Sequence, residues 1–203
     1  MSVAAPAMNQ RIQGILRAAC RVVARDGAHG LRMENVASEA GVSKALVHYY
    51  FSTRQELLKS AFAYSEELTR RAVESELAAL GTGAERIERF LILSLGDESL
   101  FNENRALWNE VWASMRFADE LRPSVDQHYR EWLGWVVRLV NEGRGDGSIP
   151  GHVDPVSAGQ RLAAIADGLD SMLYLGLLDR ERACELVLES LALELGRPAQ
   201  SGS

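Results

Sequence analysis

The sequence has no long hydrophobic run. None of its apolar stretches approaches the roughly 18 residues that a membrane-spanning helix needs. Its first residues, MSVAAPAMNQR, do not show a charged segment followed by an apolar one, which is the order of a secretory signal peptide. These absences argue against a membrane protein and against a secreted protein. We therefore expect a soluble chain in the cytoplasm with no membrane partner.

Cysteine and histidine are scarce. The two cysteines, Cys20 and Cys184, lie in helical patterns, where we expect small core side chains rather than a disulfide. No metal-ligand spacing connects the four histidines, which are His29, His48, His128 and His152. Neither cysteine has a base near it in the sequence. We predict no metal site, no cofactor and no catalytic residue, and we keep an enzyme as a rival interpretation that turnover of a candidate ligand would reveal.

Strand patterns are missing as well. Apolar residues recur at helical spacing along almost the whole chain, and glycine-rich or proline-containing turns interrupt them. Helices are expected at residues 9–25, 33–40, 44–50, 54–80, 84–96, 103–117, 123–142, 154–177 and 179–195. The sequence therefore predicts an all-α fold of about nine helices. The segment GRGDG at 143–147 follows a helix and leads into Pro150, so we interpret it as a helix end and not as a phosphate-binding loop.

Charge is distributed unevenly along a chain whose net charge is −6. Residues 1–60 carry eight Lys and Arg against four Asp and Glu, whereas residues 61–203 carry 14 against 24. A basic N-terminal part on an acidic remainder suggests that only the N-terminal part meets a polyanion. Ordinary scatter of charges is the alternative that composition leaves open.

The most informative segment is the short helix expected at 44–50. Ser43 stands at the N-cap position, where its hydroxyl can accept a bond from a backbone amide. At 100° per residue, Leu46, Val47 and Tyr50 fall on one side. The opposite side presents Lys44, Ala45, His48 and Tyr49. An inner apolar face would thus dock the helix, while the outer face presents a cation, an imidazole and a phenol.

The residues before this helix have the form of a helix-turn-helix. Ala37 allows two helices to approach closely, Gly41 permits the turn and Val42 fills the joint. The major groove of DNA admits such a second helix, and Lys44 and Arg54 suit phosphates or guanine edges. The alternative is a connecting helix whose polar face only meets water. Exposed neighbouring aromatic side chains argue against that alternative, because solvated faces seldom display them.

Residues 11–59 resemble the N-terminal DNA-binding domain of the TetR family of transcriptional regulators. The resemblance lies in Val36-Ala37, in GVSKALVHYYF (41–51) and in STRQELL (52–58). The family usually has Gly at position 45, Thr at 46, Tyr at 48 and a Thr cap at 32, so Arg32 is expected to cap its helix poorly. The resemblance implies groove contacts by Ser43, Lys44, Ala45, His48 and Tyr49, and backbone contacts by Tyr50 and Arg54.

Residues 61–200 look like the C-terminal domain of BetI-type members of the same family. The resemblance is carried by RALWNEVWASM, YREWLGWVVRLVNEG and DPVSAGQRLAAIADGLDSMLYLGLLD. It implies a homodimer in which the last two helices form the interface. The candidate interface residues are Leu162, Leu169, Leu173, Leu177, Leu186 and Leu191. Helices that are apolar on more than one face have something beyond their own core to cover.

Aromatic residues gather in the same C-terminal part. The candidate ligand-binding residues are Phe90, Trp108, Trp112, Met115, Tyr129, Trp132 and Asp167. An aromatic box with a carboxylate suits a cationic or quaternary ammonium ligand through cation–π attraction. Plain core packing is the alternative for each aromatic residue, and a salt bridge across a dimer is the alternative for Asp167 or Asp170.

Taken with the resemblance, these features predict a ligand-responsive regulator that binds a double-stranded DNA operator. We expect a disordered tail at 1–8, a helix-turn-helix domain at 9–53, a helical effector-binding and dimerisation domain at 54–197 and a disordered tail at 198–203. The predicted function is that of a homodimeric repressor released from a pseudo-palindromic operator by a small molecule. A TetR-like activator and a helical protein-binding adaptor without DNA affinity are the alternatives.

Overall fold

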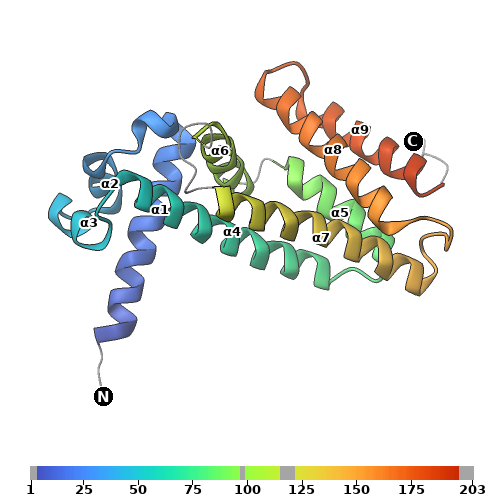
Figure 1. Cartoon of the computed structure of the whole chain (residues 1–203), viewed down its shortest axis with the longest axis horizontal. Coiled ribbons are helices and arrows are strands. Elements are labelled where there is room, and N and C mark those ends of the chain that lie inside the picture. The colour runs from blue at the N-terminus through green and yellow to red at the C-terminus, as the bar shows by residue number, and fades with distance from the viewer. Residues whose placement is uncertain (1–3, 97–98, 115–121, 197–203) are drawn as a thin grey trace. The chain divides into compact units, whose positions relative to one another are not determined.

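The computed structural model describes residues 4–96, 99–114 and 122–196. Within these ranges the chain forms nine α-helices and no strand (Figure 1), so the predicted all-α fold is confirmed. The helices are α1 (Ala4–Gly30), α2 (Met33–Ala40), α3 (Lys44–Tyr50), α4 (Arg54–Ala78), α5 (Gly83–Leu95), α6 (Ser99–Ser114), α7 (Arg122–Asp146), α8 (Pro155–Tyr174) and α9 (Arg180–Glu194).

Two helices have the predicted bounds and others do not. The ranges 33–40 and 44–50 agree with α2 and α3. Helix α1 begins at Ala4, five residues before the predicted start, and is broken at Gly27, where the backbone adopts φ 67° and ψ −173°. Helix α8 ends at Tyr174, earlier than predicted, because Gly176 takes a left-handed φ of 67°. The tail expected at 198–203 lies outside the described residues.

The chain divides into two compact units. Unit 1 comprises Met1–Arg71 and Glu98–Gln127, and unit 2 comprises Ala72–Asp97 and His128–Ser203. Helix α4 therefore begins in unit 1 and ends in unit 2. Unit 1 contains α1, α2, α3 and α6, whereas the predicted helix-turn-helix domain ended at residue 53. The functional boundary between DNA-binding and effector-binding parts stays a prediction.

Unit 1 is built around α1. This helix packs against α2 and α6, and α2 packs against α3. Its buried stripe includes Ile15 and Val22, while α2, α3 and α6 contribute Val36, Val47 and Leu107 to the same core. Removing these side chains from water stabilises the unit by roughly 1.5–3 kcal/mol each. The apolar stripe predicted along 9–25 therefore positions the helix-turn-helix.

Unit 2 is built around α5, α8 and α9, which contact one another. Leu162 of α8, Val187 of α9 and Leu91 of α5 are fully buried there. A bidentate ion pair joins α8 to α9: Arg161 Nε and Nη2 each lie 2.6 Å from a carboxylate oxygen of Glu194. Bidentate geometry of this kind adds direction as well as attraction, so the pair connects the two helices at this point, although solvent screens the 56% exposed Arg161 side chain.

The start of α5 depends on a segment that is distant in sequence. The Gly83 amide donates to Asp146 Oδ2 at 2.7 Å, and the Ala84 amide donates to Ser148 Oγ at 3.1 Å. Side chains from the end of α7 and the turn after it thus satisfy amides that a helix start leaves without partners. The predicted helix end at residue 142 is wrong, because α7 continues through the first four residues of GRGDG and ends at Asp146. Asp146 also caps α5.

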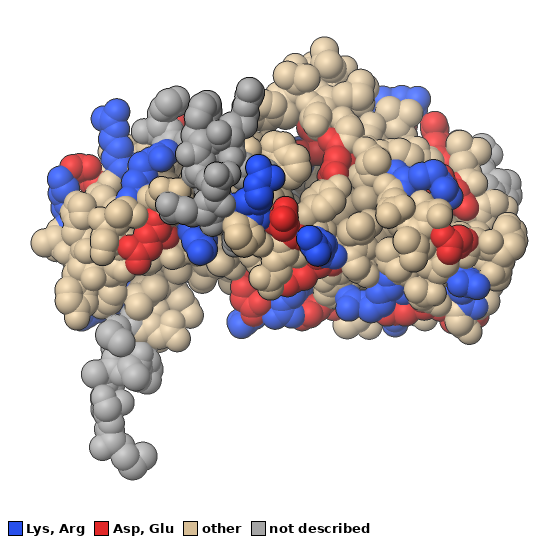
Figure 2. Space-filling model, in the orientation of Figure 1, with Lys and Arg blue, Asp and Glu red and all other residues tan. Residues whose placement is uncertain are grey.

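Charged side chains of both signs are interspersed on the face shown in Figure 2. Among the described residues, no helix is long and apolar enough to cross a membrane. In the same part of the chain, no group of three or more His, Cys, Asp or Glu could hold a metal ion.

Candidate nucleic-acid interface and ligand site

The turn between α2 and α3 sets the direction of α3. Gly41 ends α2 with a left-handed φ of 65°, a conformation that most side chains disfavour. The Val42 amide closes the turn by donating to the Ala37 carbonyl oxygen at 3.0 Å. Ser43 then caps α3, since its Oγ accepts from the Leu46 amide at 3.2 Å. The predicted helix-turn-helix joint and the predicted cap are both present.

The predicted outer face of α3 is open to solvent. Val47 is buried and Leu46 and Tyr50 are half-buried, so this side docks the helix onto unit 1. The exposed residues of α3 are Lys44, Ala45, His48 and Tyr49. Tyr49 is 77% exposed, and its ring meets that of Tyr50 edge to face at 5.0 Å between centroids. Packing in a core does not explain an aromatic side chain as exposed as that of Tyr49.

Glu34 is a member of this surface that the sequence analysis missed. Its Oε1 accepts a bond from Lys44 Nζ across the turn, and both side chains are more than half exposed. The Lys44 ammonium holds the pKa of Glu34 below its usual range. In the sequence, Glu34 resembles an acid placed in the first turn of α2 to suit the helix dipole. Only the folded turn brings it to Lys44.

Arg54 and Arg32 lie beside this surface. Arg54 Nε donates to the Leu31 carbonyl oxygen at 3.1 Å, which ties the first residue of α4 to the link between α1 and α2. Arg32 occupies the N-cap position of α2 without a side-chain bond to that helix, so its predicted poor capping is confirmed. Asn35 instead donates from Nδ2 to the Gly30 carbonyl oxygen at 2.8 Å, which fastens α2 to the end of α1.

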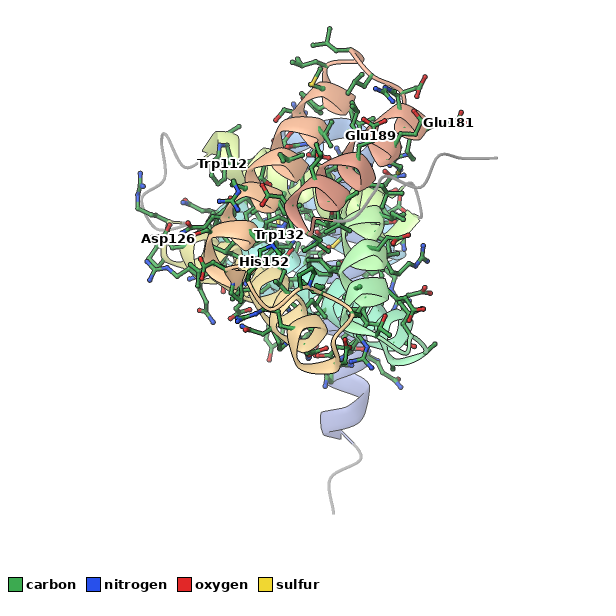
Figure 3. The ribbon with its side chains drawn as sticks, turned by 90° about the vertical axis from the view of Figure 1, so that its right-hand side faces the viewer. Trp112, Asp126, Trp132, His152, Glu181 and Glu189 are labelled. Atoms are coloured by element: carbon green, nitrogen blue, oxygen red, sulfur yellow. The ribbon has the colours of Figure 1, made fainter. Side chains whose placement is uncertain are left out.

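A row of aromatic rings occupies unit 2. Tyr129 and Trp132 of α7 lie 6.0 Å apart between ring centroids, and Phe90 of α5 lies 6.2 Å from Trp132. Phe90 also stacks on Trp135 at 6.0 Å with an interplanar angle of 12°. Figure 3 labels Trp132 on its helix. Three of the predicted ligand residues are therefore neighbours, and Trp135, which was not among the candidates, extends the row.

Asp167 of α8 joins this row through Tyr129. The Tyr129 hydroxyl donates to Asp167 Oδ2 at 2.7 Å. Asp167 is exposed as a residue, but desolvation of its carboxyl group raises its pKa, and the bond from Tyr129 opposes that change. Burial and the bond to Asp167 raise the pKa of Tyr129 to about 12. A cation bound beside this carboxyl group would favour its ionised form, so the group and the neighbouring aromatic rings suit a cationic partner.

An open groove of about 370 Å³ lies next to Trp135. Side chains from the end of α4, from α5 and from α7 line it, including Glu74, Arg86, Trp135, Arg138 and Glu142. The Arg138 guanidinium carbon lies 3.8 Å from the centroid of the Trp135 ring. The indole face that would attract an external cation is therefore covered by a cation of the protein itself.

The remaining aromatic candidates belong to unit 1. Trp108 packs edge to face on Phe62 at 5.0 Å, and its Nε1 donates to Glu66 Oε1 at 2.8 Å. Trp112 is 56% exposed. The predicted set thus divides between the units, with Phe90, Tyr129, Trp132 and Asp167 in unit 2. Met115 lies outside the described residues.

The candidate interface leucines have different surroundings. Leu162, Leu169 and Leu191 are buried within a single chain, so they belong to its own core. Leu173 and Leu186 are half-buried, and Leu177 is 65% exposed. The exposed apolar residues on and next to α8 and α9 that the candidate set left out are Val156, Met172, Tyr174, Leu175 and Leu193. Helical periodicity identified the helices but not the side of each that the chain leaves uncovered.

Family models match two parts of the chain. Residues 15–61 match the model of bacterial regulatory proteins of the tetR family, and residues 83–196 match the C-terminal domain of BetI-type transcriptional repressors. The HTH-type transcriptional regulator BetI of Agrobacterium fabrum is 29% identical over 113 residues, covering 55% of this chain and 54% of that protein. The chain thus matches about half the length of that relative. BetI of Brucella suis is 23% identical over 192 residues, covering 93% and 94%.

Solved structures with the same fold include two regulators in complex with small molecules. A TetR-family transcriptional regulator from Rhodococcus sp. has a TM-score of 0.79 and 27% identity, covering 92% of this chain and 99% of that one. A transcriptional regulator from Saccharomonospora viridis in complex with choline has a TM-score of 0.81 and 24% identity, covering 89% and 95%. FadR of Bacillus subtilis in complex with stearoyl-CoA has a TM-score of 0.68 and 21% identity, covering 90% and 96%.

Proposed function

Because the chain belongs to the TetR family of transcriptional regulators and has a BetI-type C-terminal domain, we propose that it is a homodimeric repressor released from its operator by a small molecule. The observation that supports this proposal best is the exposed face of α3. Lys44, His48 and Tyr49 stand on the second helix of a helix-turn-helix, where a side chain can reach base edges in the major groove.

The proposed operator is a pseudo-palindrome. Two copies of α3, related by the two-fold axis of a dimer, would enter major grooves about 34 Å apart, one helical turn of DNA, or a multiple of that distance. Ser43 and Ala45 would lie close to the groove with the three side chains named above. Tyr50 and Arg54 would contact the DNA backbone at the edge of this surface, with Arg54 positioned by its bond to Leu31.

The proposed effector is a small organic cation. Tyr129 and Trp132 offer aromatic faces, and Asp167 offers a carboxylate beside them. A cation bound there would stabilise the ionised form of Asp167, whose pKa is raised without it. The choline complex of the Saccharomonospora viridis regulator supports this class of ligand. Such a ligand releases DNA only through a higher affinity for the shape that does not fit the operator.

Selection of bound sequences from a random duplex pool tests DNA recognition. The parent should enrich a palindrome, and a Lys44→Ala/Tyr49→Ala variant, which changes two exposed side chains, should not. Absence of enrichment by the parent at low salt, with and without choline, would instead favour an adaptor without DNA affinity. A reporter gene downstream of the recovered operator then distinguishes a repressor from an activator, because expression falls with the first and rises with the second.

Ligand titrations of the full chain test the effector class. Choline should bind the parent and release the recovered operator, while Asp167→Asn should weaken choline binding by roughly tenfold through loss of the counter-charge. Stearoyl-CoA is the comparison ligand, because FadR of Bacillus subtilis is solved with it. Release of the operator by stearoyl-CoA and not by choline would exclude the cationic class.

A further inference from the structure

A carboxylate stands on the surface that is proposed to meet DNA. Glu34 lies in the first turn of α2, and its Oε1 accepts a bond from Lys44 Nζ on the exposed face of α3. Its side chain is 58% exposed and that of Lys44 is 52% exposed. Solvent screens an exposed pair, whose contribution to folding is about 0–1 kcal/mol. Stability of the fold is therefore a weak explanation for this contact.

The other acid of α2 has a different role. Glu39 lies 2.8 Å from Arg21 Nε and 3.0 Å from Arg25 Nη1, so it connects α2 to α1. Glu34 connects α2 to the outer face of α3. The two glutamates thus form a natural comparison: one pairs with arginines of α1, and the other with the lysine proposed to read DNA.

The effect of Glu34 depends on what Lys44 meets. Along the phosphate backbone a carboxylate is repelled, and the pairing leaves the ammonium partly neutralised. At the major-groove edge of a G·C pair, by contrast, guanine presents the acceptors O6 and N7, and cytosine presents the N4 amino donor beside them. A neighbouring ammonium and carboxylate match that edge, with the ammonium donating to guanine and the carboxylate accepting from cytosine.

We propose that Glu34 and Lys44 read one G·C base pair in each operator half-site as a unit, and that Glu34 is a specificity-determining residue. This inference rests on the proposed function, since it assumes that α3 enters the major groove. Glu34 weakens binding to arbitrary sequences, where it faces phosphates. It supports binding at one base pair, where its other carboxylate oxygen accepts a hydrogen bond from the N4 amino group of cytosine.

Two variants of Glu34 separate charge from base reading. Glu34→Gln removes the charge and keeps an acceptor oxygen, whereas Glu34→Ala removes both. On a duplex without an operator, both should bind about two to five times more tightly than the parent at low salt, with a salt dependence steeper by up to about one counterion. In selection from a random pool, Glu34→Ala should lose roughly tenfold preference for one G·C pair per half-site.

The controls make the test specific. Glu39→Gln removes an acid from the same helix and should leave that base preference unchanged. Lys44→Ala should lose the same preference as Glu34→Ala, and the Lys44→Ala/Glu34→Ala double variant should lose no more than either single variant. Circular dichroism checks that all variants keep the helical fold.

The outcomes distinguish this inference from the proposed function. A parent without any sequence preference overturns both. A selective parent whose preference survives in Glu34→Ala overturns the inference alone. Equal weakening of all DNA binding by Glu34→Ala and Glu39→Gln would overturn it too, because that result assigns Glu34 only a structural role on α2.

Discussion

The pKa of Asp167 depends on the groups around its carboxyl group. Desolvation of its carboxyl group raises its pKa although the residue is exposed, while the bond from the Tyr129 hydroxyl, 2.7 Å from Oδ2, opposes part of that rise. The folded chain therefore keeps the Asp167 proton to a higher pH than the unfolded chain. Above the unfolded pKa of about 3.9, the ionised carboxylate costs folding free energy, and this cost grows until pH exceeds the folded pKa.

Replacement of Asp167 by Asn should consequently stabilise the chain in a pH-dependent way. Near pH 7 the variant should melt above the parent by no more than about 2 °C, because it has no charge to desolvate and solvent screens much of that charge at this exposed residue. Near pH 3 the parent carboxyl is protonated, so the difference should vanish. Thermal melts by circular dichroism at both pH values measure this, and an equal difference at both would contradict the assignment.

Tyr129→Phe is the companion variant, since it removes the bond that favours the ionised form of Asp167 and should destabilise the chain most at pH 7.

Individual residues differ in how far the sequence could predict them. The face formed by Lys44, His48 and Tyr49 follows from 100° periodicity in one short helix, and the structure exposes all three. The contact between Glu34 and Lys44 depends on the angle of the turn at Gly41, which periodicity does not encode. The site roles of these residues stay predictions until DNA binding is measured.

Helices α5 and α7 approach each other closely at Gly83, the first residue of α5. A Cβ atom built at Gly83 would lie 2.1 Å from the Gly143 amide nitrogen and 2.5 Å from its Cα. The neighbouring backbone of α7 cannot move away as a flexible side chain would. The same crossing brings Asp146 to the start of α5, where its carboxylate accepts from the Gly83 amide. One close contact therefore sets both the packing of the two helices and the cap of α5.

Gly83→Ala should therefore destabilise the chain by about 3 kcal/mol or more, since the overlap is with backbone. Gly134→Ala is a matched control on α7, because nothing lies within 4 Å of a Cβ built there. Alanine at that exposed helical position should stabilise by about 0.5–1 kcal/mol. Urea unfolding curves of the two variants should shift in opposite directions. A shift of the same sign and size in both would mean that the crossing imposes no steric limit.

Element boundaries were predictable where local chemistry sets them. Ser43 and Gly41 give α3 a clear start and α2 a clear end, so both ranges agree with the structure. The ends of α1 and α8 were not predictable in this way. Gly27 interrupts α1, which still continues to Gly30, and α8 ends at Tyr174, two residues before Gly176. The cap that Asp146 gives to α5 joins positions 63 apart in sequence, a distance beyond any local pattern.

At the scale of the whole molecule, exposed apolar side chains on and next to α8 and α9 indicate a surface that a second copy could cover. Leu177 is 65% exposed, Tyr174 is 73% exposed and Leu193 is 82% exposed. Tyr174 and Leu177 lie at and just after the end of α8, whereas Leu193 is next to Glu194, which pairs with Arg161 near the start of α8. Clustered apolar groups such as those at the end of α8 mark interaction surfaces more often than scattered single ones do. The proposed dimer would use them, whereas Leu162, Leu169 and Leu191 would support the interface from inside each chain.

Leu177→Glu should weaken such a dimer by at least about tenfold, because a charge would be buried against the partner. Analytical ultracentrifugation over a concentration series measures the change. Tyr49→Ala is the control: it removes an exposed side chain from α3 in unit 1, so it should lose operator affinity and keep the parent's association state. If Leu177→Glu sediments like the parent at every concentration, this leucine lies outside the interface.

The guanidinium of Arg138 over Trp135 has an optical consequence. The excited state of indole has a large dipole, so a positive charge 3.8 Å above its ring shifts the wavelength at which it emits. A molecule that enters the adjoining groove and displaces Arg138 would remove that charge, and the wavelength of maximum emission of Trp135 would shift. In a variant with Trp108, Trp112 and Trp132 replaced by Phe, the emission of Trp135 should therefore indicate whether the groove is occupied, and a further Arg138→Gln change provides the spectrum of the uncovered ring.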